Sequence, residues 1–130
     1  MEGKIKILVV DDNQLQLAIA GDALAEAGFE VFTVDQGPKV YSEVLKNNPH
    51  LILLDIMMPG IDGIEICRNL KRSPKTKDIL IVIYSSKRDA DLMNLCYEFG
   101  ADGYIIKSEH LEQTVNRVKE ILREKLPRKA

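Results

Sequence analysis

Residues 51–63 read LILLDIMMPGIDG, an apolar run that ends on a carboxylate and passes into a Pro-Gly pair. The four residues Leu51 to Leu54 have the length and the continuous apolar character of a strand that is covered on both faces of a sheet. Asp55 follows at once, and Asp62 with Glu65 indicates the capped start of a helix. A buried strand that ends on an acid raises the question of what the acid does, and the neighbouring segments answer it.

Strand-like and helix-like segments alternate along the whole chain of 130 residues. Strands are predicted at residues 5–10, 30–34, 51–54, 79–84 and 103–106. Helices are predicted at residues 13–27, 37–47, 62–72 and 89–99, and from 111 to near 127. In the first helix, Leu15, Ile19, Ala23 and Ala27 recur every four residues, which is typical of a helical period.

The connections between the predicted strands decide how the sheet pairs. Strands separated by a helix cannot form hairpins, so they pair in parallel through right-handed crossovers. The predicted fold is therefore an α/β domain, in which a doubly wound five-stranded parallel sheet carries helices on both faces. Ligands bind such sheets outside the carboxyl ends of the strands, so the residues just after each strand are the functional candidates.

The composition argues against several classes of protein. Hydrophobic residues make up 45% of the chain, which is enough for one core, and 18 Lys and Arg residues stand against 20 Asp and Glu residues. This balance predicts no direct binding to nucleic acid. The start of the chain fits neither a signal peptide nor a membrane span, so we expect a cytoplasmic protein without membrane contact. Cys67 and Cys96 are expected to be reduced thiols in the core.

Polar side chains follow four of the predicted strands. The first strand ends in Asp11 and Asp12, the third in Asp55, the fourth in Ser85 and the fifth in Lys107. Three carboxylates at one edge of a sheet would repel one another unless a cation joined them. Carboxylate, carbonyl and water oxygens are the ligands of Mg²⁺, so the sequence predicts a magnesium site at this edge.

A lysine and a hydroxyl beside a magnesium site suit a phosphoryl group. Lys107 supplies a point charge and Ser85 a hydrogen-bond donor for the phosphoryl oxygens. A carboxylate beside Mg²⁺ can attack phosphorus and form an acyl phosphate, which makes Asp55 the candidate nucleophile. Each of these residues alone could be an ordinary turn or surface residue, but together they occupy the carboxyl ends of four separate strands.

Four segments of the chain resemble one known family. They are LVVDDN at 8–13, LLDIMMPGIDG at 53–63, YSS at 84–86 and GADGYIIK at 100–107. In this order and spacing they resemble the receiver domain of bacterial two-component response regulators, over residues 4–125. The resemblance implies a flavodoxin-like fold with strand order 2-1-3-4-5. It divides the chain into a receiver domain at 1–125 and a short basic tail at 126–130.

The resemblance also implies a role for each residue of the expected magnesium site. Asp55 would be the phosphoacceptor and a metal ligand. Asp12 would be a direct ligand of Mg²⁺, Asp11 a ligand through water and Met57 a ligand through its backbone carbonyl. Magnesium is the one cofactor that the resemblance implies.

The same resemblance implies a switch. Ser85 and Lys107 would bind the phosphoryl group, Ser85 moving toward it, and Tyr104 would turn inward. Most receivers have proline after the lysine, usually behind a cis peptide bond, whereas Ser108 stands here. A cis bond before a residue other than proline costs about 2.5–4 kcal/mol, so the sequence leaves both isomers open.

The implied function is signalling. The resemblance predicts a sensor histidine kinase or a phosphotransfer protein as phosphodonor, and a downstream protein target that binds the face of the fourth helix, fifth strand and fifth helix. Phosphorylation-dependent homodimerisation is left open. The protein would be no enzyme in the usual sense, although it would assist its own Mg²⁺-dependent phosphorylation and dephosphorylation.

Three other classes of protein share part of this pattern. A haloacid-dehalogenase-type phosphatase needs a second acid two residues after its nucleophile, where Met57 stands. A flavodoxin-like cofactor binder needs a phosphate loop rich in Gly, Ser and Thr after the first strand, where the chain has DDNQ at 11–14. A pseudo-receiver, which would dock proteins independently of phosphorylation, usually lacks one of the acids or the lysine, and none is missing here.

Overall fold

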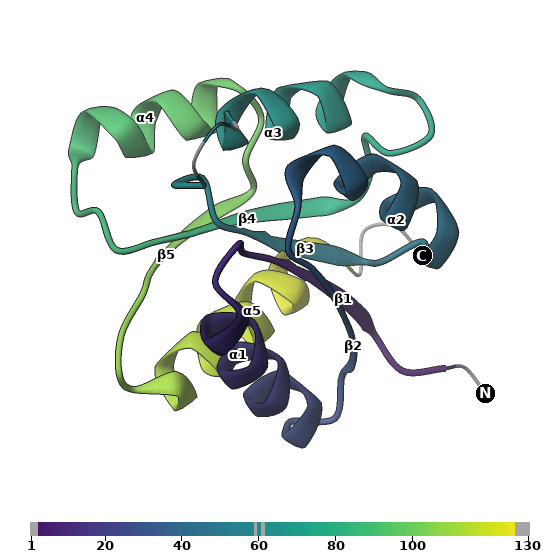
Figure 1. The fold of residues 1–130 in the computed structure, drawn as a ribbon, viewed down its shortest axis with the longest axis vertical. Coiled ribbons are helices and arrows are strands. Elements are labelled where there is room, and N and C mark those ends of the chain that lie inside the picture. The colour runs from purple at the N-terminus through teal and green to yellow at the C-terminus, as the bar shows by residue number, and fades with distance from the viewer. Residues whose placement is uncertain (1–2, 59, 61, 127–130) are drawn as a thin grey trace.

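The computed structural model describes residues 3–58, 60 and 62–126. Five parallel strands form one sheet in the order β2-β1-β3-β4-β5. In Figure 1 the sheet crosses the middle of the molecule between two layers of helices. The predicted doubly wound fold and its strand order 2-1-3-4-5 are therefore confirmed.

Strands and helices alternate along the chain as expected. The strands are β1 (Lys6–Val10), β2 (Glu30–Val34), β3 (Leu51–Leu54), β4 (Leu80–Ser85) and β5 (Gly103–Ile106). The helices are α1 (Gln14–Glu26), η1 (Gly37–Lys39), α2 (Val40–Asn47), α3 (Gly63–Arg72), α4 (Ala90–Glu98) and α5 (Leu111–Lys125). The segment predicted as one helix at 37–47 is thus a 3-10 turn followed by an α-helix.

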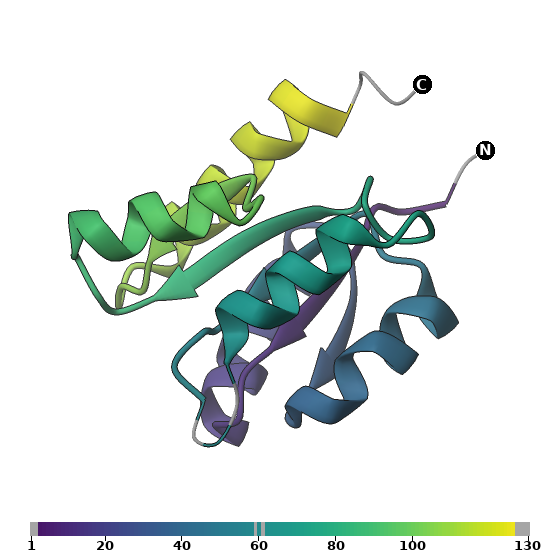
Figure 2. The ribbon, with the colours of Figure 1, turned by 90° about the horizontal axis from the view of Figure 1, so that it is seen from above.

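Alternating residues of each strand point to opposite faces of the sheet and pack into two separate core layers. One layer packs Leu8, Ile52 and Ile83 against α2, α3 and α4. The other packs Leu53 and Val82 against α1 and α5. Figure 2, seen from above relative to Figure 1, shows α3 and α4 (teal and green) in front of the strands and α1 and α5 (purple and yellow) behind them. Since both faces are covered, the middle strands have no polar face, which explains their continuous apolar sequences.

The apolar series in α1 does not form its buried face. Leu15 is 66% exposed and Ile19 is 38% exposed, whereas Leu17, Ala20 and Leu24 pack into the core. Four residues turn an α-helix by about 400°, so a series with a strict period of four drifts by about 40° at each step. The series therefore begins in solvent and reaches the sheet only near the end of the helix.

Polar side chains cap the N-termini of three helices at the carboxyl edge of the sheet. Asn13 accepts a hydrogen bond from the backbone N–H of Gln16 at the start of α1. Asp62 caps α3 and Asp89 caps α4 in the same way. These caps satisfy amide groups that have no partner inside the helix, so the loops after β1, β3 and β4 end at fixed points.

The predicted tail at 126–130 is described only at Leu126, which packs against the α1 and α5 layer. Residues 127–130 lie outside the described residues, as do two loop residues of the quoted stretch, 59 and 61. The division into a domain at 1–125 and a tail at 126–130 stays a prediction.

Candidate functional site

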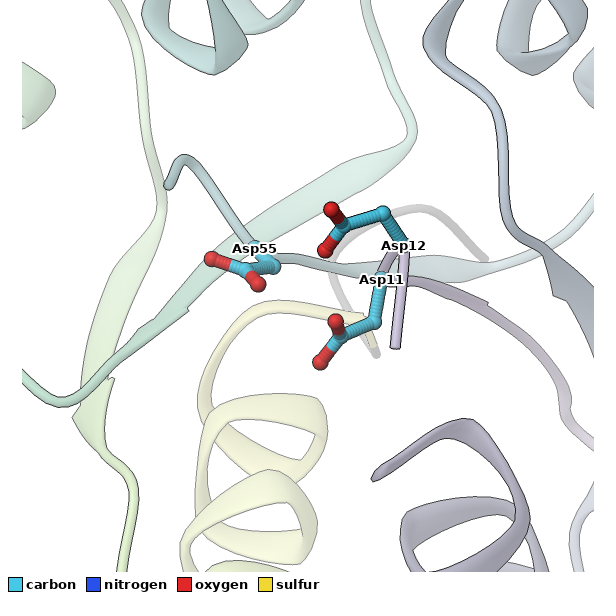
Figure 3. Close-up of side chains that lie close together, drawn as sticks. All are labelled: Asp11, Asp12 and Asp55. Atoms are coloured by element: carbon cyan, nitrogen blue, oxygen red, sulfur yellow. The ribbon is translucent and has the colours of Figure 1, made fainter. Parts of the chain in front are cut away.

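Three carboxylates meet at the carboxyl ends of β1 and β3. Asp11, Asp12 and Asp55 each offer an oxygen, and these oxygens all lie within 4.8 Å of one another. Figure 3 shows the three side chains gathered at the ends of the two neighbouring strands. The cluster predicted from the strand ends is therefore present.

The sheet holds the backbone of this cluster in place. Asp11 donates its N–H to the Val34 carbonyl of β2, and Asp55 donates its N–H to the Val10 carbonyl of β1. One oxygen of Asp55 accepts the backbone N–H of Met57 at 2.8 Å. The two buried carboxylates thus stand on strand ends whose positions depend on pairing between residues far apart in the sequence.

Lys107 reaches the same cluster from the loop after β5. Its Nζ lies 2.9 Å from Asp11 Oδ2 and 3.3 Å from Asp55 Oδ2. Its backbone N–H donates to the Ser85 carbonyl at the end of β4. No peptide bond is cis among the described residues, so the Lys107–Ser108 bond is trans and the lysine still contacts both acids.

Burial and the contacts with Met57 and Lys107 act in opposite directions on the pKa of Asp55, and the Asp11 charge adds to the effect of burial. Its side chain is almost fully buried, and this loss of hydration raises the pKa of Asp55 above its usual value. The Met57 N–H and the Lys107 ammonium oppose that rise. Burial also acts to lower the pKa of Lys107, but its hydrogen bond to Asp11 and the nearby carboxylate charges raise it overall. Lys107 is therefore protonated at neutral pH.

The residues present fit a hard divalent cation. Asp11 is 3% exposed and Asp55 is 5% exposed, and the Lys107 ammonium forms ion pairs with both of these buried carboxylates. Asp12 is exposed and reaches the same point from the solvent side. Three carboxylates beside the Lys107 ammonium leave an excess of negative charge, which Mg²⁺ would neutralise.

A cavity of about 650 Å³ opens over the cluster. Its wall contains the acids and Lys107, together with residues that the sequence did not predict as site residues: Asn13, Gln16, Ile19, Ser86, Ser108, Glu109 and Leu111. Asn13, Gln16 and Ile19 lie at the N-cap and in the first two turns of α1. The others lie in the loops after β4 and β5, except Leu111, which is the first residue of α5. The signal that could have found them is their position, because they follow strands whose carboxyl ends converge.

Ser85 and Tyr104 both form hydrogen bonds with the backbone of Lys87. The Ser85 hydroxyl is buried and accepts the Lys87 N–H at 3.1 Å, and the cavity wall contains Ser86 in its place. The Tyr104 ring is buried and its hydroxyl donates to the Lys87 carbonyl at 2.9 Å. Contact of Ser85 with a phosphoryl group would require a change in this loop, and the predicted switch stays a prediction.

The two cysteines and one of the two histidines lie away from this site. Cys67 and Cys96 are free and buried in the layer of α3 and α4. Burial raises the pKa of the Cys67 thiol to about 11. His50 accepts the Lys6 N–H through Nδ1, where β1 meets β3. None of these side chains lines the cavity over the carboxylates.

The fold and the carboxylate site define a class of protein. Residues 7–119 match the response regulator receiver domain family, and the chain belongs to that family. Receiver domains are signalling domains of two-component systems that are phosphorylated on an aspartate. The resemblance drawn from the four sequence segments is therefore confirmed.

Particular relatives share this domain over nearly the whole chain. The phosphate regulon transcriptional regulatory protein PhoB of Pseudomonas aeruginosa is 38% identical over 123 residues, which are 95% of this chain and 53% of PhoB. The chain spans about half the length of the curated relatives it matches.

Two solved structures resemble the fold of this chain. The phosphorylated cyanobacterial phytochrome response regulator RcpA superimposes with a TM-score of 0.79 at 32% identity, over 96% of this chain and 95% of that chain. Chemotaxis protein CheY4 of Vibrio cholerae superimposes with a TM-score of 0.87 at 22% identity, over 92% of this chain and 100% of that chain. The second likeness concerns the fold alone. Within the described part of the chain, no helix is both long and apolar enough to cross a bilayer.

Proposed function

We propose that this chain is a phosphorylation-activated switch of a two-component system in the cytoplasm. It accepts a phosphoryl group on Asp55 from a sensor histidine kinase or a phosphotransfer protein, in a reaction that requires Mg²⁺. The observation that carries the proposal is the geometry of the cluster: three carboxylate oxygens lie within 4.8 Å of one another, and the Lys107 ammonium contacts two of the carboxylates.

The reaction is a transfer from nitrogen to oxygen. A carboxylate oxygen of Asp55 forms a bond to phosphorus while the bond from phosphorus to the imidazole nitrogen of the donor breaks, and the imidazole keeps the electron pair. Lys107 is placed to balance the charge on the phosphoryl oxygens, since its Nζ already lies 3.3 Å from Asp55 Oδ2. Asp11, Asp12, Asp55 and the Met57 carbonyl would hold Mg²⁺, which when bound supplies further positive charge.

Burial of Asp55 favours the transfer. The ionised carboxylate is poorly solvated, so its attacking oxygen has little water to lose when it bonds to phosphorus. The open cavity of about 650 Å³ gives a donor imidazole access to this oxygen from solvent.

The output face of the proposed switch is formed by α4, β5 and α5. Ser85 and Tyr104 are linked through the backbone of Lys87, in the loop that leads from β4 into α4. A movement of Ser85 toward a phosphoryl group would break its hydrogen bond to the Lys87 N–H and so disturb the carbonyl that anchors Tyr104. Exposed Leu95 and Tyr97 of α4 offer apolar surface for a protein target.

The test is intact mass after incubation with acetyl phosphate, with and without Mg²⁺. The expected result is one added phosphoryl group on the wild type, which requires Mg²⁺ and disappears in Asp55→Asn. Asp22→Asn, which changes an exposed carboxylate of α1, is the matched control and should behave as the wild type does. An adduct that persists in Asp55→Asn would contradict the assignment of the phosphoacceptor.

The alternative of a pseudo-receiver gains no support from the site. Such a docking module would have no use for three converging carboxylates and a lysine that pairs with two of them. Absence of any adduct on the wild type, with Mg²⁺ and either acetyl phosphate or phosphoramidate, would favour this alternative.

A further inference from the structure

Tyr84 lies beside the lysine of the candidate site. The Lys107 Nζ is 5.4 Å from the centroid of the Tyr84 ring, within the range of a cation–π contact. We propose that Tyr84 is a positioning residue, whose ring face holds the Lys107 ammonium beside Asp55 and whose hydroxyl ties this arrangement to α5. The inference rests on the proposed function, because it concerns how Lys107 is presented to the phosphoryl group.

The ring has a fixed place because it is anchored at both ends. Tyr84 is the penultimate residue of β4, and the strand alternation directs it into the layer of α1 and α5. It is only 4% exposed. Its hydroxyl lies 3.5 Å from the Oγ1 of Thr114, a buried residue of α5, so the two hydroxyl groups can share a hydrogen bond. The backbone fixes one end of the side chain and α5 fixes the other.

Lys107 needs such support because its other partners are expected to change. Its ammonium contacts Asp11 and Asp55, which are also the candidate metal ligands and, for Asp55, the phosphoacceptor. A lysine ammonium stands on a flexible stem of four methylene groups, so it moves readily when an ion pair breaks. The ring contact involves neither carboxylate, so it can persist while the charges around the site are redistributed. At 20% side-chain exposure the ammonium is partly desolvated, which strengthens its attraction to a ring face.

The contact also gives α5 a route to the site. Thr114 sits on the first turns of α5, and Lys107 belongs to the loop that precedes this helix. A change in the position of α5 would move the Tyr84 hydroxyl and with it the ring under the ammonium. The arrangement therefore couples one element of the proposed output face to the lysine of the site.

The first measurement is the chemical shift of the Lys107 side-chain protons by NMR. An ammonium and its neighbouring methylene over an aromatic face are shifted upfield by the ring current. The wild type should show this shift and nuclear Overhauser contacts between Lys107 and the Tyr84 ring, and Tyr84→Phe should retain the shift because it keeps the ring. Tyr84→Leu should lose it.

The second measurement is the rate of phosphorylation by acetyl phosphate in Mg²⁺. Tyr84→Leu should lower the rate at saturating donor by about 3- to 10-fold, with little change in the donor concentration that gives half of that rate. Tyr84→Phe keeps the ring but loses the hydroxyl contact with Thr114, so its rate should lie between those of Tyr84→Leu and the wild type. Leu122→Ala removes a buried side chain from the same core layer and controls for lost stability: it should leave the Lys107 shift in place.

The outcomes separate the two proposals. If the wild type lacks both the upfield shift and the Overhauser contacts, the positioning role is overturned without any variant, even if Tyr84→Leu fails to fold. If Tyr84→Phe behaves as Tyr84→Leu does, the ring face is not the determinant and the inference is equally overturned. If the shift is present but the wild type accepts no phosphoryl group, the function of the site fails while the placement of Lys107 by Tyr84 stands.

Discussion

The Asp55 carboxylate is buried, although its ionised form would be better solvated in water. Asp55 is buried at the end of a fully apolar strand, where hydration of a charged group is lost. The Met57 N–H and the Lys107 ammonium recover part of that loss, but burial still raises the pKa of Asp55. The residue thus lowers the stability of the fold in its ionised form, as reactive groups at functional sites often do.

The first prediction concerns the stability cost of Asp55. A carboxyl whose pKa is higher in the folded than in the unfolded chain binds more protons when folded, so its contribution to stability falls as pH rises through that interval. The interval begins near the usual pKa of 3.8 and extends upward. Asp55→Asn should therefore raise the free energy of unfolding at pH 7 without divalent cations, by an amount on the order of 1 kcal/mol, and by less near pH 4.

Urea unfolding of both proteins between pH 4 and 7.5 measures this difference. Comparison of variant with wild type cancels the titration of carboxylates that lie far from Asp55. Equal stability gains at both ends of the pH range would show that Asp55 does not carry the expected charge cost.

At the scale of the elements, the start of α3 packs closely against Ile56, the residue that follows Asp55. Gly63, the first residue of α3, leaves no room for a side chain, since a Cβ built there would lie 2.5 Å from the Ile56 Cα. Close approach of these two backbones packs Ile56, the residue after Asp55, against the start of α3. The φ of Gly63 is not positive, so its backbone conformation does not require glycine. The close contact with Ile56 is the reason that a larger residue does not fit.

The second prediction compares two glycine substitutions. Gly63→Ala should lower the free energy of unfolding by about 1–3 kcal/mol, because the backbone at Ile56 must move. Gly21→Ala should raise it by about 0.5–1 kcal/mol, because Gly21 is inside α1 and its Cβ would make ordinary contacts at 3.7 and 3.8 Å.

Thermal or urea unfolding of the two variants decides between these expectations. The chemical change is the same in both, so opposite signs would isolate the close contact as the cause. Gly63→Ala as stable as the wild type would mean that the backbone at Ile56 moves at little cost.

On the scale of the whole molecule, the site joins parts of the chain that are distant in sequence. The ion pair between Lys107 and Asp11 spans 96 positions, and that between Lys107 and Asp55 spans 52. The unfolded chain holds no such cluster, so a cation that binds here binds the folded state and stabilises it as a unit.

The third prediction follows from this linkage. Mg²⁺ at about 100 times its dissociation constant should raise the free energy of unfolding by about 2.7 kcal/mol. Asp12→Asn should reduce the gain at the same concentration, because Asp12 supplies the exposed carboxylate of the cluster. Asp22→Asn, on the exposed surface of α1, should keep the full gain.

Thermal unfolding with increasing MgCl₂, repeated after removal of the metal with EDTA, checks this prediction. A matched ionic strength of NaCl controls for general screening of the carboxylates. An Asp12→Asn variant that gains as much stability as the wild type would place the cation elsewhere.

The type and order of the elements, and the positions that follow the strands, could be predicted from the amino-acid sequence alone. Both depend on local pattern: apolar runs of strand length, capping residues, and the rule that parallel strands bring their carboxyl ends to one edge. Asp11, Asp55 and Lys107 could therefore be predicted to meet before any distance was known, and they do.

The tertiary structure decided where the other side chains point. It turned the Ser85 hydroxyl to the Lys87 backbone, placed the Tyr84 ring beside the lysine, and left Leu15 and Ile19 of α1 in solvent. These features depend on rotamers and on the rotation of each helix against the sheet, which are set by neighbours far away in the sequence. A local pattern contains the period of an element but not the partner that its faces will contact.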